Sequence, residues 1–222
     1  MFIQRNLAAE LEEARSLWPV VVLTGGRQTG KTELLRTAYP AAMFVSLDLP
    51  SIAEAAEKDP GFLLDDDSAH PVIIDEVQYA PGLFRQIKAR IDQNRHRMGR
   101  YFLTGSQKFT LMKEVSESLA GRAAILEMET LSSAELLAHP GFGHYALADF
   151  LWRGGFPELY RNPSLRPAQY YASYVASYLE RDLRLALQVG NLRDFERFLR
   201  MAAIRCGQLL NLTDLARDVG IA

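Results

Sequence analysis

The stretch that decides the fold is residues 19–35, which read PVVVLTGGRQTGKTELL. Its first part, VVVL at 20–23, is an apolar run without a charge and predicts a buried strand. The next part matches the pattern G-x-x-x-x-G-K-[ST] in full, from Gly25 through Gly30 to Lys31 and Thr32. A helix is predicted to begin there and to continue to residue 38. A strand, a glycine loop and a helix in this order indicate an α/β domain.

This loop has the chemistry that a polyphosphate requires. Gly25 and Gly30 allow positive φ angles and bring backbone N–H groups close to phosphate oxygens, where a Cβ would intervene. The helix start adds unpaired N–H groups and the positive end of its dipole. Lys31 is predicted to reach the β- and γ-phosphates, and the Thr32 hydroxyl to ligate Mg²⁺. The predicted nucleotide-binding set is Gly25, Gly26, Arg27, Gln28, Thr29, Gly30, Lys31, Thr32 and Glu33.

A second motif lies at residues 70–76, HPVIIDE, where an apolar strand ends in two carboxylates. In open α/β sheets, ligands bind at the carboxyl ends of the strands. Asp75 is therefore predicted to hold Mg²⁺, and Glu76 to orient or deprotonate an attacking water. Asp-Glu after a strand is by itself weak evidence for a nucleotide site. The evidence becomes strong here because the pair follows the glycine loop, with one predicted strand, residues 42–47, between the two motifs.

Two further segments supply candidate catalytic residues. The strand predicted at 100–104 is followed by Gly-Ser-Gln, so Thr104, Ser106 and Gln107 are candidate sensors of the γ-phosphate, with Ser106 favoured. Their alternative role is to cap the next helix. Arg122 precedes a last strand at 123–128 and is a candidate charge-stabilising arginine, within the chain or toward a neighbouring subunit, or else a structural ion-pair partner. The predicted catalytic set is Lys31, Glu76, Ser106 and Arg122, and the predicted metal ligands are Thr32 and Asp75.

Composition limits the function classes. A net charge of -2, with 48% hydrophobic and 23% charged residues, is typical of a soluble globular protein. The chain lacks an apolar run of the roughly 18 residues that a membrane helix needs and has no signal-peptide pattern. The single cysteine, Cys206, lies in an apolar segment and is predicted to be a buried thiol. We expect a cytoplasmic protein without a membrane partner. The four histidines are scattered and predict no metal cluster.

The motifs TGGRQTGKTELL, VIIDEVQYAP, FLTGSQ and SLAGR with LSSAEL together resemble the AAA-type P-loop ATPases of bacteria and archaea that carry a C-terminal domain of unknown function. The resemblance continues through GGFPELY at 154–160 to the chain end. It implies a RecA-like or AAA-like α/β core, with a mostly parallel sheet flanked by helices, followed by an all-helical segment and an incomplete winged-helix-like end. The predicted domains are a P-loop ATPase core at 1–140, a helical segment at 141–206 and the start of a truncated helix-turn-helix at 207–222.

Two features depart from that pattern. Glu33 stands where the family often has Thr or Ser, and its carboxylate would repel an α-phosphate, so nucleotide binding is predicted to be weaker than usual. Residues 211–222 resemble the helix and turn that precede a DNA-recognition helix, with Asn211 as N-cap, and the recognition helix itself is missing. DNA is thus a candidate partner through a complete C-terminal region. Arg181 is a second candidate to approach the nucleotide, or it pairs with its acidic neighbours.

The leading functional prediction is Mg²⁺-dependent ATP binding and hydrolysis that changes the contact between the core and the C-terminal segment. The alternative is a nucleotide-gated regulator or DNA-associated binding protein with little turnover. A small-molecule kinase is disfavoured because Asp75 and Glu76 favour water as the acceptor. ATP and ADP are the predicted ligands, Mg²⁺ the predicted metal, and self-association is a further candidate interaction.

Overall fold

The structure is a computed structural model of all 222 residues, and it describes residues 2–64, 70–106, 108–142, 147–178 and 192–220. Contacts between residues divide the chain into two compact units, Met1–Pro167 and Ala168–Ala222. The first unit contains the sheet, and in the described part of the second unit all regular elements are helices. The predicted boundaries at residues 140 and 206 stay predictions.

A parallel sheet of five strands forms the centre of the first unit, in the order β2-β3-β4-β1-β5. The strands are β1 (Val20–Thr24), β2 (Met43–Ser46), β3 (Val72–Asp75), β4 (Tyr101–Gly105) and β5 (Ala123–Glu127). β1, β3 and β4 are buried along their whole length, which explains why they read as continuous apolar runs instead of alternating ones. The predicted α/β class with a mostly parallel sheet is confirmed.

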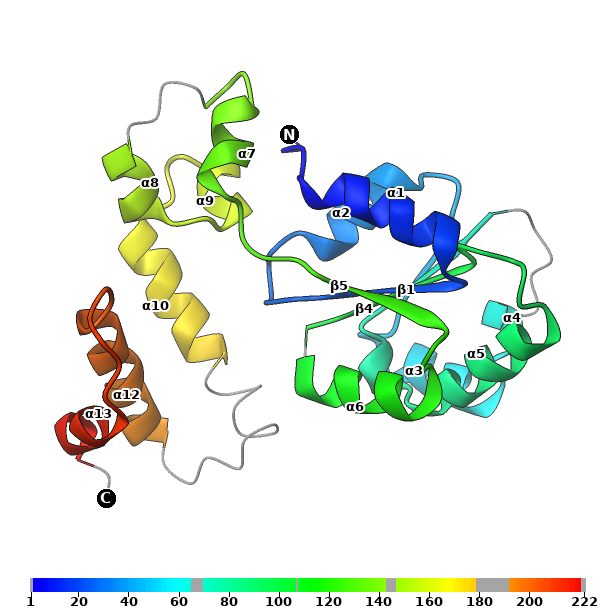
Figure 1. The fold of residues 1–222 in the computed structure, drawn as a ribbon. Coiled ribbons are helices and arrows are strands. Elements are labelled where there is room, and N and C mark those ends of the chain that lie inside the picture. Colours follow the sequence, from blue (N-terminus) through cyan, green and yellow to red (C-terminus); the bar gives the residue numbers. More distant parts are fainter. Residues whose placement is uncertain (1, 65–69, 107, 143–146, 179–191, 221–222) are drawn as a thin grey trace. The chain divides into compact units, whose positions relative to one another are not determined.

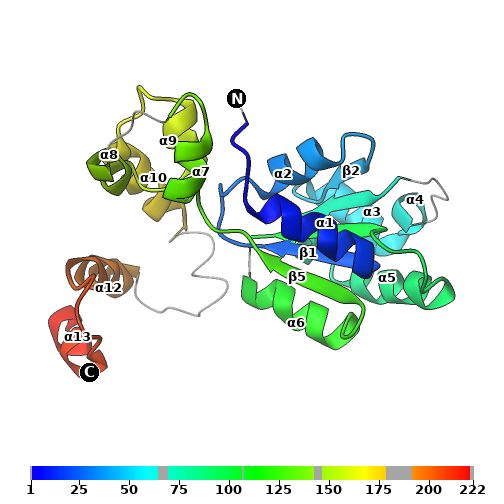
Figure 2. The ribbon, with the colours of Figure 1, turned by 45° about the horizontal axis from the view of Figure 1, so that its top comes forward.

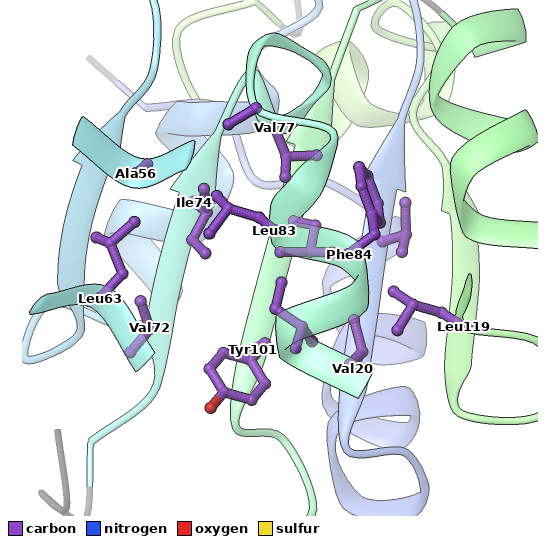
Figure 3. Packing of buried hydrophobic residues seen from close by; sticks show 14 of the residues in the cluster. Val20, Ala56, Leu63, Val72, Ile74, Val77, Leu83, Phe84, Tyr101 and Leu119 are labelled. Carbon is purple, nitrogen blue, oxygen red and sulfur yellow. The ribbon is translucent and has the colours of Figure 1, made fainter. Parts of the chain in front are cut away.

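Helices cover both faces of the sheet (Figure 1). One face carries α1 (Leu7–Leu17) and α2 (Lys31–Ala38), which pack on Val21 and Leu23 of β1. Val20 and Val22 of the same strand belong to the opposite face, and a second set of elements packs on them (Figure 3). The elements that cover this second face are α3 (Pro50–Lys58), α4 (Gly61–Leu64), the 3-10 turn η1 (Val77–Tyr79), α5 (Gly82–Gln93) and α6 (Lys108–Ser118). Because side chains alternate along a strand, one apolar segment serves two cores.

The register brings the carboxyl ends of the strands to one edge of the sheet. Thr24, the last residue of β1, is opposite Gly105 of β4 and Glu127 of β5. Ser46 of β2 is opposite Asp75 of β3. The residues that follow these strands are therefore neighbours in space although they are distant in sequence, and this edge is where ligands bind in open α/β sheets.

Beyond β5 the first unit continues as three short helices, α7 (Ser133–Ala138), α8 (Leu147–Arg153) and α9 (Pro157–Arg161). The backbone between α8 and α9 lies against the segment after β5, since the Leu131 N–H donates to the Gly155 carbonyl at 2.7 Å. A Cβ on Gly155 would lie 2.3 Å from the Leu131 carbonyl oxygen, so only glycine fits there. The Tyr160 hydroxyl donates to the Gly154 carbonyl at 2.7 Å. Gly155 thus docks the GGFPELY segment on the chain after β5, and the Tyr160–Gly154 hydrogen bond closes the segment on itself.

The second unit contains α10 (Pro167–Tyr178), which begins at the boundary, α12 (Leu192–Ile204) and α13 (Leu212–Val219). Asn211 caps α13 as predicted, because its side chain accepts from the Asp214 N–H at 3.2 Å. The prediction of a buried Cys206 is wrong. α12 ends at Ile204, and the thiol is exposed in the turn that follows. The incomplete winged-helix-like end stays a prediction.

Candidate functional site

The glycine loop leaves β1 at the carboxyl edge of the sheet and leads into α2. Gly25 has φ +137°, and a Cβ there would lie 2.2 Å from the Met128 carbonyl oxygen. Gly30 has φ +96° and precedes the first residue of α2. Both glycines are needed for their backbone conformation, because residues with a Cβ rarely adopt such angles and Gly25 has no space for one.

Lys31 is the first residue of α2 and is buried. Its Nζ donates to the carbonyl oxygens of Gly25 at 2.9 Å and Gly26 at 2.7 Å. Burial lowers the pKa of Lys31, while the carboxylates of Glu76 and Asp75 oppose that shift. The ammonium group therefore lies within the curve of the loop, where a phosphate would replace loop carbonyls as its partner.

Asp75, at the end of β3, joins three elements. It accepts from Thr32 Oγ1 of α2, which lies 3.0 Å from Oδ1 and 3.1 Å from Oδ2. It also accepts from Thr104 Oγ1 of β4 at Oδ1. Burial raises the pKa of Asp75, and the two threonine hydroxyls act against this shift. The result is a buried carboxylate with a hydroxyl beside it, which is an oxygen pair of the kind that Mg²⁺ prefers.

Glu76 adopts an unusual backbone conformation. Its φ of 54° and ψ of 47° are left-handed, which costs about 1–3 kcal/mol for a residue other than glycine. Its side chain accepts at Oε2 from Ser106 N at 3.2 Å and Ser106 Oγ at 3.0 Å, and also from Gln78 Nε2. Strain of this kind persists only where the surroundings determine it, and it is common at functional sites.

Most of the predicted residues that the structure describes lie together, and Arg122 lies apart from them. Thr32 donates to Asp75 and Ser106 donates to Glu76. Lys31 interacts electrostatically with both carboxylates. Glu33 is exposed in the first turn of α2. Gln107 and Arg181 lie outside the described residues.

Arg122 lies at the amino ends of the strands, opposite the edge that carries the loop. The next residue, Ala123, is opposite Val20 at the start of β1, so the length of that strand, about 13 Å at ~3.3 Å per residue, separates Arg122 from the loop. Its guanidinium donates to both carboxylate oxygens of Asp92, at 2.9 and 3.0 Å. This is the ion pair that the sequence left open as the alternative. A role toward a neighbouring subunit stays a prediction.

Two residues at the site were not found from the sequence. Gln78 lies two positions after Glu76 and donates to the Glu76 carboxylate. The strand-end motif considered for catalysis stopped at Glu76 and so did not include Gln78. Arg5 is buried and donates from Nη1 to the Thr29 carbonyl in the loop at 2.8 Å. Nothing in the local sequence distinguishes Arg5 from an exposed arginine before a helix.

The arrangement fits a nucleoside triphosphate with a divalent cation. The loop offers a cradle that a Cβ at residue 25 would fill, and a buried ammonium lies within it. The described residues contain no group of three or more His, Cys, Asp or Glu side chains that could hold a metal. Mg²⁺ in such sites is usually held by one or two protein oxygens together with phosphate oxygens, so the oxygens of Thr32 and Asp75 would be enough to hold it beside a phosphate.

Comparisons with known proteins agree with this geometry. An AAA domain model matches residues 18–137, which include the whole sheet and the loop. The chain belongs to the AAA domain family. A second model, a domain of unknown function (DUF8612), matches residues 144–222. This family and the phosphate-loop fold indicate nucleotide binding.

The relatives of this AAA protein include two curated mycobacterial proteins, both named as uncharacterized: Mb2031c of Mycobacterium bovis and Rv2008c of Mycobacterium tuberculosis. Each is 32% identical over 222 residues, covering 99% of this chain and 48% of the relative. The chain thus spans about half the length of the curated relatives it matches. A Walker-type ATPase of Pyrococcus abyssi, paby2304, has a similar fold, with a TM-score of 0.61 and 14% identity over 99% of this chain and 89% of that one.

No helix in the described parts of the chain is both long enough and apolar enough to cross a membrane.

Proposed function

We propose that the protein binds ATP with Mg²⁺ and hydrolyses it, with water as the acceptor of the γ-phosphoryl group. One observation carries the proposal. The oxygens of Thr32 and Asp75 lie within 3.0 and 3.1 Å of each other, and the next residue after Asp75, Glu76, supplies a second carboxylate on the same strand end. A metal-binding pair beside a candidate base is what phosphoryl transfer to water requires.

Each residue has a distinct role in this proposal. The loop amides and Lys31 hold the phosphates and offset charge that develops on them. Mg²⁺, held by Thr32 and Asp75, would neutralise charge on the phosphate oxygens. Glu76 orients the water and accepts its proton as the oxygen attacks the γ-phosphorus, and ADP leaves with the bridging oxygen. Ser106 holds the Glu76 carboxylate through its amide and its hydroxyl at 3.2 and 3.0 Å.

A second candidate function is a nucleotide-gated regulator, including one that associates with DNA, with little turnover. It is favoured by the state of the Glu76 carboxylate, which already accepts from Ser106 and Gln78 at one oxygen. These hydrogen bonds occupy Oε2, so only the other carboxylate oxygen is left to take up a proton from water. In this case ATP occupancy would set the conformation, and hydrolysis would be incidental.

Replacing Glu76 tests the proposal. Glu76→Gln keeps the shape and the contact with Ser106 and removes the base, so phosphate release under saturating Mg-ATP should fall by at least about a hundredfold. ATP affinity, measured with a fluorescent analogue, should stay within about threefold of the wild type. Glu54→Gln on α3 is a matched control, since Glu54 is exposed and distant in sequence from the loop, and it should turn over at the wild-type rate.

The outcomes separate the two candidates. Mg-dependent turnover that disappears in Glu76→Gln supports hydrolysis with Glu76 as the base. A wild-type protein that binds ATP and releases no phosphate supports the regulator instead. Equal turnover in the wild type and Glu76→Gln contradicts the role of Glu76.

A further inference from the structure

A buried ion pair outside the proposed catalytic set reaches the phosphate loop. Arg5 lies before α1 and Glu135 lies in α7, 130 positions apart, and their side chains are only 6% and 5% exposed. Arg5 Nε donates to Glu135 Oε1 at 2.9 Å. Figure 2 shows the N-terminal segment beside α7. Burying both charges is costly unless each group finds several hydrogen-bond partners. The partners of the remaining Arg5 donors therefore show which segments the buried guanidinium connects.

The guanidinium of Arg5 uses its other donors on backbone carbonyls of two segments. Nη1 donates to the Thr29 carbonyl in the loop at 2.8 Å. Nη2 donates to the carbonyls of Glu129 at 2.7 Å and Thr130 at 3.3 Å, directly after β5. Arg5 therefore ties the phosphate loop to the chain that follows the last strand. Lysine could not do this, because a single ammonium lacks the planar fork that reaches separate acceptors.

Glu135 is held from two sides. Oε1 accepts from Arg5 and from the Asn6 N–H at 2.8 Å, and Oε2 accepts from Ser132 N at 2.8 Å and Ser132 Oγ at 3.1 Å. Glu135 and Ser132 form the capping box of α7. Oε2 therefore binds the start of α7, while Oε1 binds Arg5 and the Asn6 amide. Substitutions can remove the contacts of one oxygen without those of the other.

The contact with Thr29 fixes the orientation of a loop peptide. The peptide between Thr29 and Gly30 is trans, so its N–H points opposite to its carbonyl. With the carbonyl bound to Arg5, the Gly30 N–H points away from Arg5. Gly30 also caps α2, and N–H groups at this end of a helix are the ones that bind phosphate. A Cβ on Gly30 would lie 3.7 Å from Met128 Cε and 4.0 Å from Arg5 Nη1, so Met128 and Arg5 lie on the same side of the loop.

We propose that Arg5 is a positioning residue of the phosphate loop, which it fixes through the Thr29 carbonyl, and that Glu135 holds Arg5 in place. The inference rests on the proposed nucleotide binding and adds to it. Arg5 acts on the phosphates through the loop backbone and does not touch the base. Its loss should weaken ATP and ADP alike, and should leave the preference for ATP over GTP unchanged.

The test compares a double variant with a matched control. Arg5→Met combined with Glu135→Gln removes both charges, so that neither is left buried alone. Ser132→Ala removes only the hydroxyl on the opposite face of Glu135. Each protein is checked by thermal unfolding, and the Kd values for Mg-ATP, Mg-ADP and Mg-GTP are then measured well below its unfolding temperature. The double variant should bind ATP and ADP about tenfold more weakly, as expected when hydrogen bonds to a charged group are lost. Ser132→Ala should lower the unfolding temperature and leave all three Kd values unchanged.

Several results would overturn the inference. A folded double variant with wild-type affinity shows that the loop does not depend on Arg5. A changed ratio of ATP to GTP affinity shows that Arg5 contacts the base. An equal loss in Ser132→Ala shows that general destabilisation of α7 is the cause. If the wild-type protein binds none of these nucleotides, the proposed function fails as well.

Hydrogen exchange of the wild-type protein provides a second measurement that depends on no variant. If Arg5 joins the loop to the segment after β5, Mg-ADP should slow exchange in the loop and also at residues 129–135. Protection of the loop alone would contradict the link.

Discussion

Thr32 Oγ1 lies 3.0 Å from Oδ1 and 3.1 Å from Oδ2 of Asp75, although the two residues are 43 positions apart. One comes from the first turn of α2 and the other from the end of β3. Parallel strands and their following helices place both at the same edge of the sheet. The pair is the part of the site at which a divalent cation is expected, and it can be tested independently of turnover.

Thr32→Ala should weaken ATP binding only when Mg²⁺ is present. The substitution removes one oxygen ligand, so we expect the Kd for Mg-ATP to rise about tenfold and the Kd for ATP measured in EDTA to stay within about twofold. Thr32→Ser keeps the hydroxyl and is the control. The two variants are compared by titration calorimetry with and without the metal. A similar loss of affinity in both conditions would mean that Thr32 does not act through the cation.

Asp75→Asn should stabilise the nucleotide-free protein at neutral pH. Burial raises the pKa of Asp75 above its ordinary value, so the folded state binds this proton more tightly than the unfolded state. The free energy of unfolding therefore falls as the pH rises through the folded-state pKa, and the ionised carboxylate is destabilising at pH 7. Its removal should add on the order of 1 kcal/mol, which is within the range of common stabilising substitutions.

Urea unfolding of the wild type and Asp75→Asn across acidic to neutral pH measures this effect. The difference should be largest at pH 7 and should shrink below the folded-state pKa of Asp75, where the wild-type carboxyl is protonated. A variant that is less stable than the wild type at pH 7 would show that the two threonine hydrogen bonds outweigh the burial of the charge.

Glu33→Thr should affect ligand affinity and protein stability in opposite directions. Glu33 is exposed in the first turn of α2, near the positive end of the helix dipole. Its carboxylate stabilises the empty helix and repels a phosphate. Calorimetry should show about threefold tighter ATP binding, while the free energy of unfolding without nucleotide should fall by about 0.5 kcal/mol. An unchanged Kd would show that Glu33 is too well solvated to act on the ligand.

The strands and the central site could be predicted because their signals are local. Apolar runs fix the buried strands, and the spacing of Gly25, Gly30 and Lys31 is that of a phosphate loop. A carboxylate at the end of a buried strand, such as Asp75, can be placed at the ligand-binding edge by topology alone. For these residues the sequence predicted the neighbours that the structure shows.

Other features depend on contacts between distant segments and had no local signal. The Arg5–Glu135 pair spans 130 positions, and each partner alone resembles a surface charge. Glu76 has a left-handed conformation, and its amide and carboxylate are bound by Thr104 and Ser106 from a neighbouring strand end. Cys206 was predicted to be buried from its apolar neighbours, and the end of α12 at Ile204 leaves it exposed.

The central claim is that the loop of residues 25–32 is a nucleotide site, and titration of Mg-ATP into the wild type and Lys31→Met tests it most directly. Methionine fills a similar volume without the charge, and the ammonium is buried with a pKa lowered by burial, so the variant should unfold at a temperature no lower than the wild type. We predict saturable binding of one ATP per wild-type chain and at least tenfold weaker binding to Lys31→Met. Equal affinity of the two folded proteins for Mg-ATP would contradict the account.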